Sequence, residues 1–418
     1  MSLNRPLCLL AILAAGLPLL ATDGYFSMGY GTASKGMGGI GVALPLDALS
    51  SAANPASLVF LGSQLDLGLA LFRPNRDFEV KGNPSGFPGT FGLAPGKVES
   101  GSKSFLCPSL GANWKLSDKS AFGVAIYGNG GMNTDYSASV FGGGSTGVNL
   151  SQLFIAPTYS YKLAEQHSVG VSAVLAYQQF EAKGLGVFGA MGFSADPSNL
   201  SNRGTDSSTG YGLRVGYLGQ FSPLFSLGAS YQTRTRMGEL KKYAGLFAEK
   251  GGFDIPSNYT AGIAFHPSET LTFALDVEKI NYSEVKSIAN PLKPNLMTAK
   301  LGNAVGAGFG WRDTTVYKLG VQWQASSDLT LRAGYNKCRQ PIPDSEVLFN
   351  ILAPGVVEEH VTVGATQAIN PNSSASFSLM RAFSKSITGS NPLEAPGAQT
   401  ITLRMDQWDF EIGYSYRF

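Results

Sequence analysis

One serine stands in the spacing of a hydrolase nucleophile. Residues 143–147 read Gly-Gly-Ser-Thr-Gly and match G-x-S-x-G, a pattern that places the central serine, here Ser145, on a sharp turn from a strand into a helix. Such a serine also needs an aspartate and a histidine later in the chain. The glycine-rich stretch around Ser145 predicts a loop between two strands instead, so the match gives little support to acyl transfer.

Two other sets of residues have the types needed for nucleotide or metal binding but lack the sequence context that such sites require. Residues 36–41, Gly-Met-Gly-Gly-Ile-Gly, match the dinucleotide-binding pattern G-x-G-x-x-G, but no apolar strand precedes them. The three histidines, His167, His266 and His360, are far apart and share no metal-ligand spacing. We therefore expect no catalytic residue, no metal and no cofactor.

The cysteines do not form a disulfide framework. Cys8 falls in an apolar run near the N-terminus, and Cys107 and Cys338 are more than 200 residues apart. The spacing leaves open whether these two pair or are unrelated small apolar residues.

The composition narrows the class of protein. Charged residues make up 14% of the 418 residues, against roughly 25% in ordinary soluble domains. Glycine accounts for 52 residues, about 12%, where about 7% is usual. The 25 Phe, 17 Tyr and 4 Trp argue against disorder, and a formal charge of only +2 argues against a nucleic-acid binder. After the N-terminal segment, no apolar run reaches the roughly 18 residues of a membrane-spanning helix.

The N-terminal segment is typical of an export signal. Arg5 supplies a positive charge, an apolar run from Leu7 to Leu20 is interrupted by Pro18, and Ala21 offers a small residue for cleavage. We predict that residues 1–21 are a secretory signal peptide.

From Gln64 to the C-terminus the dominant hydrophobic period is two, the period of a β-strand whose two faces meet different environments. The last strand is the clearest case, because its apolar face extends over eleven residues with an aromatic ring at each end. A membrane-spanning strand needs about 9–11 residues and carries aromatic residues at both interfaces. The residues of this face are Trp408, Phe410, Ile412, Tyr414, Tyr416 and Phe418.

We predict an all-β fold, a transmembrane antiparallel β-barrel of about 14 strands, because open strand edges are not tolerated in lipid. A soluble β-protein is the alternative, which the low charge and the number and length of the strands disfavour. Short and long links alternate, as the periplasmic turns and extracellular loops of outer-membrane barrels do. The predicted strands are 64–80, 103–116, 120–134, 147–162, 167–183, 208–222, 224–238, 256–267, 269–285, 313–325, 328–340, 358–369, 373–387 and 400–418.

Several stretches occur in an order shared with one known family. They begin with the glycines at 38–41, Asp47 and an Asn-Pro-Ala motif, and they continue at 122–131, 332–335, 341–344, 352–355, 360–364 and 414–418. Together they resemble the FadL/TodX outer-membrane transporters, which import long-chain fatty acids or aromatic hydrocarbons. The resemblance covers nearly the whole chain after residue 21.

The resemblance implies a plug and a lateral gate. In that family an Asn-Pro-Ala motif, here Asn54, Pro55 and Ala56, closes an N-terminal plug inside the barrel. We therefore expect residues 22–62 to form the plug and residues 63–418 the barrel. The family's third strand has an inward kink that opens a lateral hole, and Gly128, Gly130 and Gly131 interrupt that strand here. The alternative is that these glycines only ease the curvature of the barrel.

Apolar clusters in the long loops and a few cations are candidates for ligand binding. Exposed apolar patches usually mark binding, although these clusters could also pack only on one another. A buried Lys or Arg would hold a carboxylate head group by charge-assisted hydrogen bonds. The ligand-binding candidates are Phe188, Phe193, Phe247, Leu348 and Phe349 with Lys183, Arg234 and Arg236, and further lumen cations are Lys318 and Arg332.

The resulting hypothesis is passive transport of hydrophobic small molecules, with long-chain fatty acids as the expected substrate and lateral release at the third strand. The alternatives are an aromatic-hydrocarbon importer of the same fold, a membrane-embedded lipase-like enzyme, and a structural or general porin barrel. We expect a monomer in the outer membrane of a Gram-negative bacterium, in contact with lipid and lipopolysaccharide. The barrel-assembly machinery would recognise the C-terminal strand that ends at Phe418, and no nucleic acid is expected as a partner.

Overall fold

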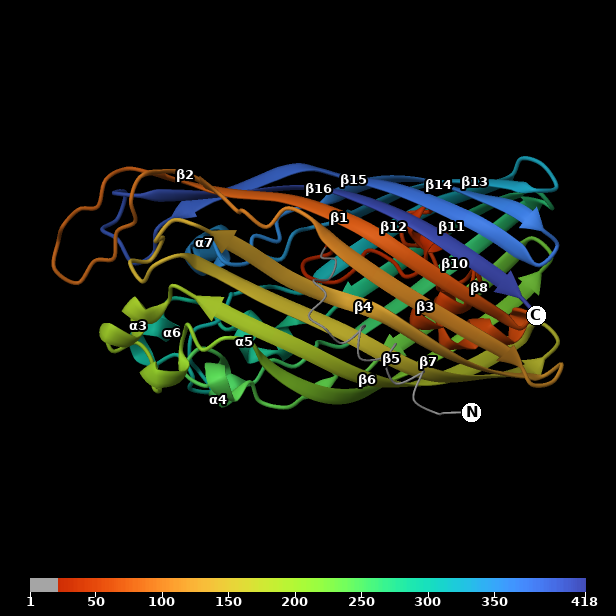
Figure 1. Cartoon of the computed structure of the whole chain (residues 1–418), viewed down its shortest axis with the longest axis horizontal. Coiled ribbons are helices and arrows are strands. Elements are labelled where there is room, and N and C mark those ends of the chain that lie inside the picture. The colour runs from red at the N-terminus through yellow and green to blue at the C-terminus, as the bar shows by residue number, and fades with distance from the viewer. Residues whose placement is uncertain (1–21) are drawn as a thin grey trace, which may run out of the picture.

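In the computed structural model, which describes residues 22–418, the period-two segments pair into one antiparallel sheet that closes on itself. Fourteen strands form the wall in chain order, and pairing of the last strand, β16, with the first, β1, closes the barrel (Figure 1). The predicted 14-strand antiparallel barrel is confirmed. The predicted signal peptide, residues 1–21, lies outside the described residues.

The wall strands differ in length around the barrel. Strands β8 and β10 to β13 have 8 to 11 residues, whereas β4 to β7, β15 and β16 have 17 to 19. Two further short strands, β2 (Gly96–Glu99) and β9 (Arg236–Met237), pair with β1 and β7. The wall consists of β1 (Gln64–Lys81), β3 (Phe105–Lys115), β4 (Ser120–Tyr136), β5 (Thr146–Ala164), β6 (His167–Lys183), β7 (Asp206–Ser222), β8 (Phe225–Gln232), β10 (Asn258–Ser268), β11 (Leu271–Ile280), β12 (Thr314–Gln324), β13 (Leu329–Cys338), β14 (Glu359–Asn370), β15 (Ser373–Ser390) and β16 (Thr400–Arg417).

The apolar phase of the strands faces outward. On β16 and at the C-terminal Phe418, the six residues predicted to share one face are 42% to 57% exposed, which places them on the outer surface. The alternate residues Gln407, Asp409 and Glu411 are buried inside the barrel. Successive side chains of a strand point to opposite faces, so one surface can suit lipid while the other suits a polar interior.

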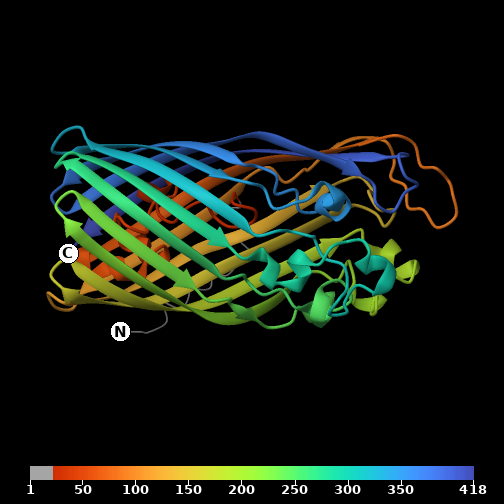
Figure 2. The ribbon, with the colours of Figure 1, turned by 180° about the vertical axis from the view of Figure 1, so that it is seen from behind.

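The long connections gather at one end of the barrel, opposite the C-terminus (Figures 1 and 2). They carry the short helices α3 (Gly186–Ala190), α4 (Ala248–Gly251), α5 (Lys286–Ala289), α6 (Asn295–Thr298) and α7 (Val347–Asn350), and the 3-10 turns η3 (Pro197–Asn199), η4 (Lys241–Tyr243), η5 (Tyr282–Glu284) and η6 (Asp344–Glu346). We call this the outer end, following the predicted placement of the long loops. Among residues 22–418, none of the helices has the length and apolar character that crossing a membrane would require.

The N-terminal residues 22–62 lie inside the barrel, where most of them are buried (Figure 2). This segment contains α2 (Thr32–Lys35), η1 (Ala48–Ala52) and η2 (Pro55–Phe60). Its backbone is held by polar side chains of the inner wall: Asp276 accepts hydrogen bonds of 2.9 and 3.1 Å from the amides of Gly41 and Val42. Asp66 accepts one of 2.8 Å from the Ala48 amide. The polar inner face of the strands therefore pairs with a segment that has little regular structure of its own.

The largest apolar core lies inside the wall and reaches into the loops of the outer end. It joins Tyr25 and Phe26 of the N-terminal segment to inward-facing wall residues and to buried residues of the long loops. Cys338 belongs to this core and Cys107 to a separate small cluster, and no disulfide bond joins them.

Candidate functional site

The wall is interrupted between β3 and β4. Their pairing runs from Lys115 opposite Ala121 to Leu110 opposite Ile126, and it stops there. Beyond Ile126, β4 stays paired with β5, with a register shift between residues 128 and 130. The interruption thus falls where the glycines of the third strand lie, and it frees one backbone edge of β4.

The N-terminal segment occupies this free edge. The amide of Ser27 donates a 2.9 Å hydrogen bond to the carbonyl oxygen of Asn129, and the amide of Gly131 donates one of 3.0 Å to that of Tyr25. A Cβ atom on Gly130 would lie 1.8 Å from the carbonyl oxygen of Tyr25. Only a residue without a side chain permits this approach, so Gly130 has a specific role in seating the N-terminal segment.

A small cavity of about 30 Å³ lies at the interruption. Its apolar lining includes Phe72 of β1, Phe105 of β3, Met132 of β4 and Trp311 from the loop 281–313. Arg76 of β1 supplies the one charged side chain among its lining residues. We call this space the wall cavity.

A second cavity, also of about 30 Å³, lies under the loops of the outer end. Its lining includes no charged side chain, and Ser287 is its one polar side chain. Phenylalanines dominate it, drawn from β6 and from four long loops: Phe180, Phe188, Phe247, Phe309 and Phe349. We call this space the outer pocket, and its chemistry suits an uncharged apolar group.

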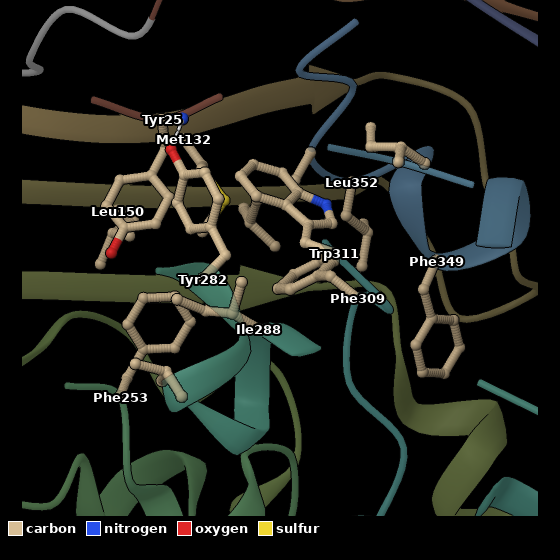
Figure 3. Packing of buried hydrophobic residues seen from close by; sticks show 14 of the residues in the cluster. Tyr25, Met132, Leu150, Phe253, Tyr282, Ile288, Phe309, Trp311, Phe349 and Leu352 are labelled. Carbon is tan, nitrogen blue, oxygen red and sulfur yellow. Dashed lines mark hydrogen bonds between the residues drawn. The ribbon is translucent and has the colours of Figure 1, made fainter. Parts of the chain in front are cut away.

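Buried aromatic side chains pack between the linings of the two cavities (Figure 3). Phe309 lines the outer pocket and Trp311 lines the wall cavity, and their ring centroids are 6.3 Å apart. Trp311 also contacts Tyr282 at 5.2 Å and Tyr25 at 6.0 Å, and its indole nitrogen donates a 2.6 Å hydrogen bond to the side-chain oxygen of Asn350. Packed aromatic side chains therefore separate the two cavities, and no charged side chain is among them.

The relationship of the chain to known proteins agrees with this arrangement. The family model described as "Outer membrane protein transport protein (OMPP1/FadL/TodX)" matches residues 25–418. The chain belongs to the FadL/TodX family. It is thus a member of an outer-membrane family of transport channels for hydrophobic compounds.

Solved structures of this FadL/TodX fold are similar over nearly the whole chain. The toluene transporter TodX of Pseudomonas putida has a TM-score of 0.71 and 19% identity, covering 94% of this chain and 99% of its own. The toluene transporter TbuX of Ralstonia pickettii has 0.65 and 20%, with the same coverage. A FadL homologue of Pseudomonas aeruginosa has 0.70 and 15%, covering 94% and 100%. No curated protein sequence matches the chain. At these identities the likeness shows the fold alone.

The structure places three predicted apolar residues of this FadL/TodX chain together. Phe188, Phe247 and Phe349 line the outer pocket. Leu348 is completely buried in the same core without lining the pocket, and Phe193 is half-buried against that core.

Two of the cations predicted to face the lumen point to the outside of the barrel. Lys183 follows Ala182, which is buried, so strand alternation turns the lysine outward, where its side chain is half exposed. Arg236 is exposed opposite Tyr211, a residue of the outer surface. The prediction that Lys183 and Arg236 face the lumen is therefore wrong.

The remaining predicted cations form ion pairs or hydrogen bonds with other side chains of the protein. Arg234 pairs with Asp254 at 2.8 Å just beyond the end of β8. Lys318 is buried inside the barrel and pairs with Glu278 at 2.8 Å, and Arg332 hydrogen-bonds wall side chains. None of the three lines either cavity.

Sequence reasoning missed Arg76 and Trp311. Arg76 could have been identified from the sequence, because it alternates in phase with Phe72, Pro74 and Phe78 on the face of β1 that is buried. A charged residue in an apolar phase is a candidate functional residue in a membrane strand. Trp311 carried no such signal, since its position depends on contacts with distant segments.

The residues that suggested other chemistry do not assemble a site. Ser145 is exposed in the loop before β5. His167 contacts Tyr217, while His266 and His360 hydrogen-bond other wall residues. Within residues 22–418, no three His, Cys, Asp or Glu side chains are grouped as metal ligands.

Proposed function

We propose that this chain is a passive outer-membrane transporter that takes up hydrophobic small molecules and releases them sideways into the membrane. The ligand enters the outer pocket, passes along Phe309 and Trp311, and leaves through the wall cavity between β3 and β4. The main support is the contact between Phe309, which lines the outer pocket, and Trp311, which lines the wall cavity at the interruption. An aqueous route would instead need a polar path through the lumen, where residues 22–62 are packed.

In this mechanism the N-terminal segment is the plug and the glycines of β4 are the lateral gate. Asn54, Pro55 and Ala56 close the plug against the wall. Gly128, Gly130 and Gly131 hold β4 away from β3, and residues 22–27 cover the free edge until a ligand displaces them. Support comes from the hydrogen bonds of Ser27 and Gly131 across that edge.

Long-chain fatty acids are the proposed substrates. Two cavities with a row of aromatic side chains between them suit an extended acyl chain, which can contact both at once. Aromatic hydrocarbons are the second candidate, because the cavities are small and lined by aromatic rings, and two proteins of similar fold are described as toluene transporters. We infer further that the protein acts as a monomer in lipopolysaccharide-containing membrane, after assembly through its C-terminal strand.

Uptake by cells that lack and regain the protein tests this proposal. Labelled palmitate and labelled toluene are offered separately, and saturable uptake of at least one must depend on the protein. The purified protein in planar bilayers should pass almost no ions, because the lumen is packed. Large steady currents, or equal uptake with and without the protein, would contradict the proposal. Ser145→Ala should transport normally, whereas a lipase-like enzyme would lose activity if that serine were its nucleophile.

A further inference from the structure

Arg76 is a buried cation without a carboxylate partner. It is 5% exposed, and its guanidinium donates to the backbone carbonyl oxygens of Asn133 and Ser102. Its Nε atom is buried and has no hydrogen-bond partner within residues 22–418. No acidic side chain of that part of the chain forms an ion pair with it. A buried charge is normally paired, because an unpaired charge in a low-dielectric interior is strongly unfavourable.

The Arg76 side chain lines the wall cavity. Phe72 and Phe105 lie beside it, and the guanidinium carbon is 5.6 Å from the centre of the Phe105 ring. Along β1, pairing with β3 ends at Phe72 and pairing with β2 begins only at Asp77. The Arg76 carbonyl oxygen accepts a 2.9 Å hydrogen bond from the Ser100 amide, and the Arg76 guanidinium reaches Asn133 of β4. Arg76 therefore lies between β1 and β4, beside the wall cavity, where residues 100–102 bridge the two strands.

The wall cavity lies where the apolar outer surface ends on the side of the outer end. Outward residues of β1 are apolar up to Leu71, and the next outward positions are Arg73 and Asn75. On the neighbouring strand the change comes at the same height, because Trp408 lies opposite Arg73 and Asp406 opposite Asn75. An aromatic residue followed by charged ones marks the interface between hydrocarbon and head groups.

We propose that Arg76 binds the carboxylate of an amphipathic ligand as it leaves through the wall, and so makes the exit selective for anionic over neutral hydrophobic molecules. This assignment rests on the transport function proposed above. Two of the five N–H groups of the guanidinium are used by the two carbonyl oxygens, and the Nε–H remains, so a carboxylate can still be held by two parallel hydrogen bonds. The tail lies along Phe72 and Phe105 toward the hydrocarbon, and the head group stays at the interface.

Binding of palmitate and of its neutral methyl ester to the purified full-length protein in phosphatidylcholine vesicles tests the proposal. Arg76→Gln should weaken palmitate binding about tenfold or more and leave the ester unchanged, since a charge-assisted pair is lost. Arg73→Gln is the matched control, because Arg73 lies on the same strand but points outward, and both ligands should bind as to wild type.

Arg76→Lys tests whether the positive charge alone, without the planar guanidinium group, is enough to bind the carboxylate. It keeps the cation without the planar fork, so it should retain a preference for palmitate over the ester. The proposal is overturned if Arg76→Gln weakens both ligands equally, which indicates a structural tie, or weakens neither. It is also overturned if phosphatidylglycerol, and not palmitate, binds in an Arg76-dependent way. If wild type binds neither palmitate nor ester, the transport function itself fails, and that result differs from a selective failure at Arg76.

Discussion

The side-chain amide of Asn54 donates a 2.9 Å hydrogen bond to the backbone carbonyl oxygen of Tyr217 in β7. The same amide donates a 2.7 Å bond to the carbonyl oxygen of Val42, and its oxygen accepts one of 3.0 Å from the amide of Ala56. At Gly216 a Cβ atom would meet the Asn54 oxygen at 2.0 Å, so a glycine in the wall makes room for the contact. One side chain thus closes the N-terminal segment on itself and fastens it to the barrel.

Replacing Asn54 by Ala should loosen the N-terminal segment. It removes the Asn54 donor from the carbonyls of Val42 and Tyr217 and the acceptor from the Ala56 amide, at a cost of about 1 kcal/mol for each hydrogen bond lost. Hydrogen exchange of residues 45–60 in the purified protein should accelerate. Ser57→Ala is the control, because the Ser57 hydroxyl is buried without a hydrogen-bond partner in the described chain, and its removal should change little. Equal exchange in Asn54→Ala and wild type would remove Asn54 from this role.

Lys35 should be the strongest electrostatic tie of the same segment. Its ammonium group lies 3.1 Å from Asp409 and 2.5 Å from Glu411, and all three are buried. Lys35→Gln leaves two buried carboxylates without their cation, which costs about 3–5 kcal/mol of docking free energy. Single-channel recordings should show larger or more frequent openings. Lys337→Gln breaks an exposed pair with Glu359 and should stay within about 1 kcal/mol of wild type.

Gly130→Ala should detach the N-terminal segment from β4, because the new Cβ atom would overlap the carbonyl oxygen of Tyr25. Exchange of the Ser27 and Gly131 amides should speed up, and ion conductance should rise. Gly186→Ala adds the same methyl group in open space and should be silent in both measurements. Normal protection of Ser27 in the Gly130 variant would show that the segment is held elsewhere.

The alternation of β16 was enough to predict an outward apolar face, because a strand in a barrel wall has only two environments. The same rule made β11 too long, from 269 to 285, whereas the strand ends at Ile280. Two residues later Tyr282 turns inward, and its ring lies 5.5 Å from that of Tyr25. A local sequence pattern cannot predict the contact between Tyr282 and Tyr25, because the two residues are 257 positions apart.

The candidate site shows the same division. Phe188, Phe247 and Phe349, which line the outer pocket, were candidates because apolar residues in a loop are unexpected in contact with solvent. Lys183 was misplaced because charge alone was weighed, although the phase of its strand would have turned it outward. The wall cavity depends on where β4 leaves β3, and glycine positions indicate such a bend without showing which side chains line it.

Glu346 should make the loops of the outer end sensitive to pH. Its carboxylate accepts a 2.7 Å hydrogen bond from the amide of Leu292, and burial raises the pKa of the Glu346 carboxyl above its ordinary value. A raised pKa means that the docked loop prefers the protonated acid. This stabilisation is complete below the ordinary carboxyl pKa and is lost as pH rises through the raised value.

Glu346→Gln should therefore remove the pH dependence and keep the loop docked in alkaline solution. Exchange of residues 286–312, corrected for intrinsic rates, should rise from pH 4 to pH 8 in wild type and stay flat in the variant. Glu239→Gln, at an exposed position in another outer loop, should behave like wild type. A wild-type profile that is already flat would contradict the assignment.

Phe188 should set the size of ligand that the outer pocket accepts. Its ring contacts those of Phe91, Phe141 and Phe349, with centroids 5.3 to 5.5 Å apart. The outer pocket, which Phe188 and Phe349 line, has a volume of only about 30 Å³. Phe188→Ala removes a ring from this wall, so the pocket enlarges while loop packing loses about 3–5 kcal/mol. The ratio of naphthalene to toluene affinity should therefore rise, because the larger molecule gains the vacated space. Phe87→Ala removes a ring that is 65% exposed and should leave the ratio unchanged. If both variants keep the wild-type ratio, ligands do not enter at this pocket, and the path would have to begin nearer the wall cavity.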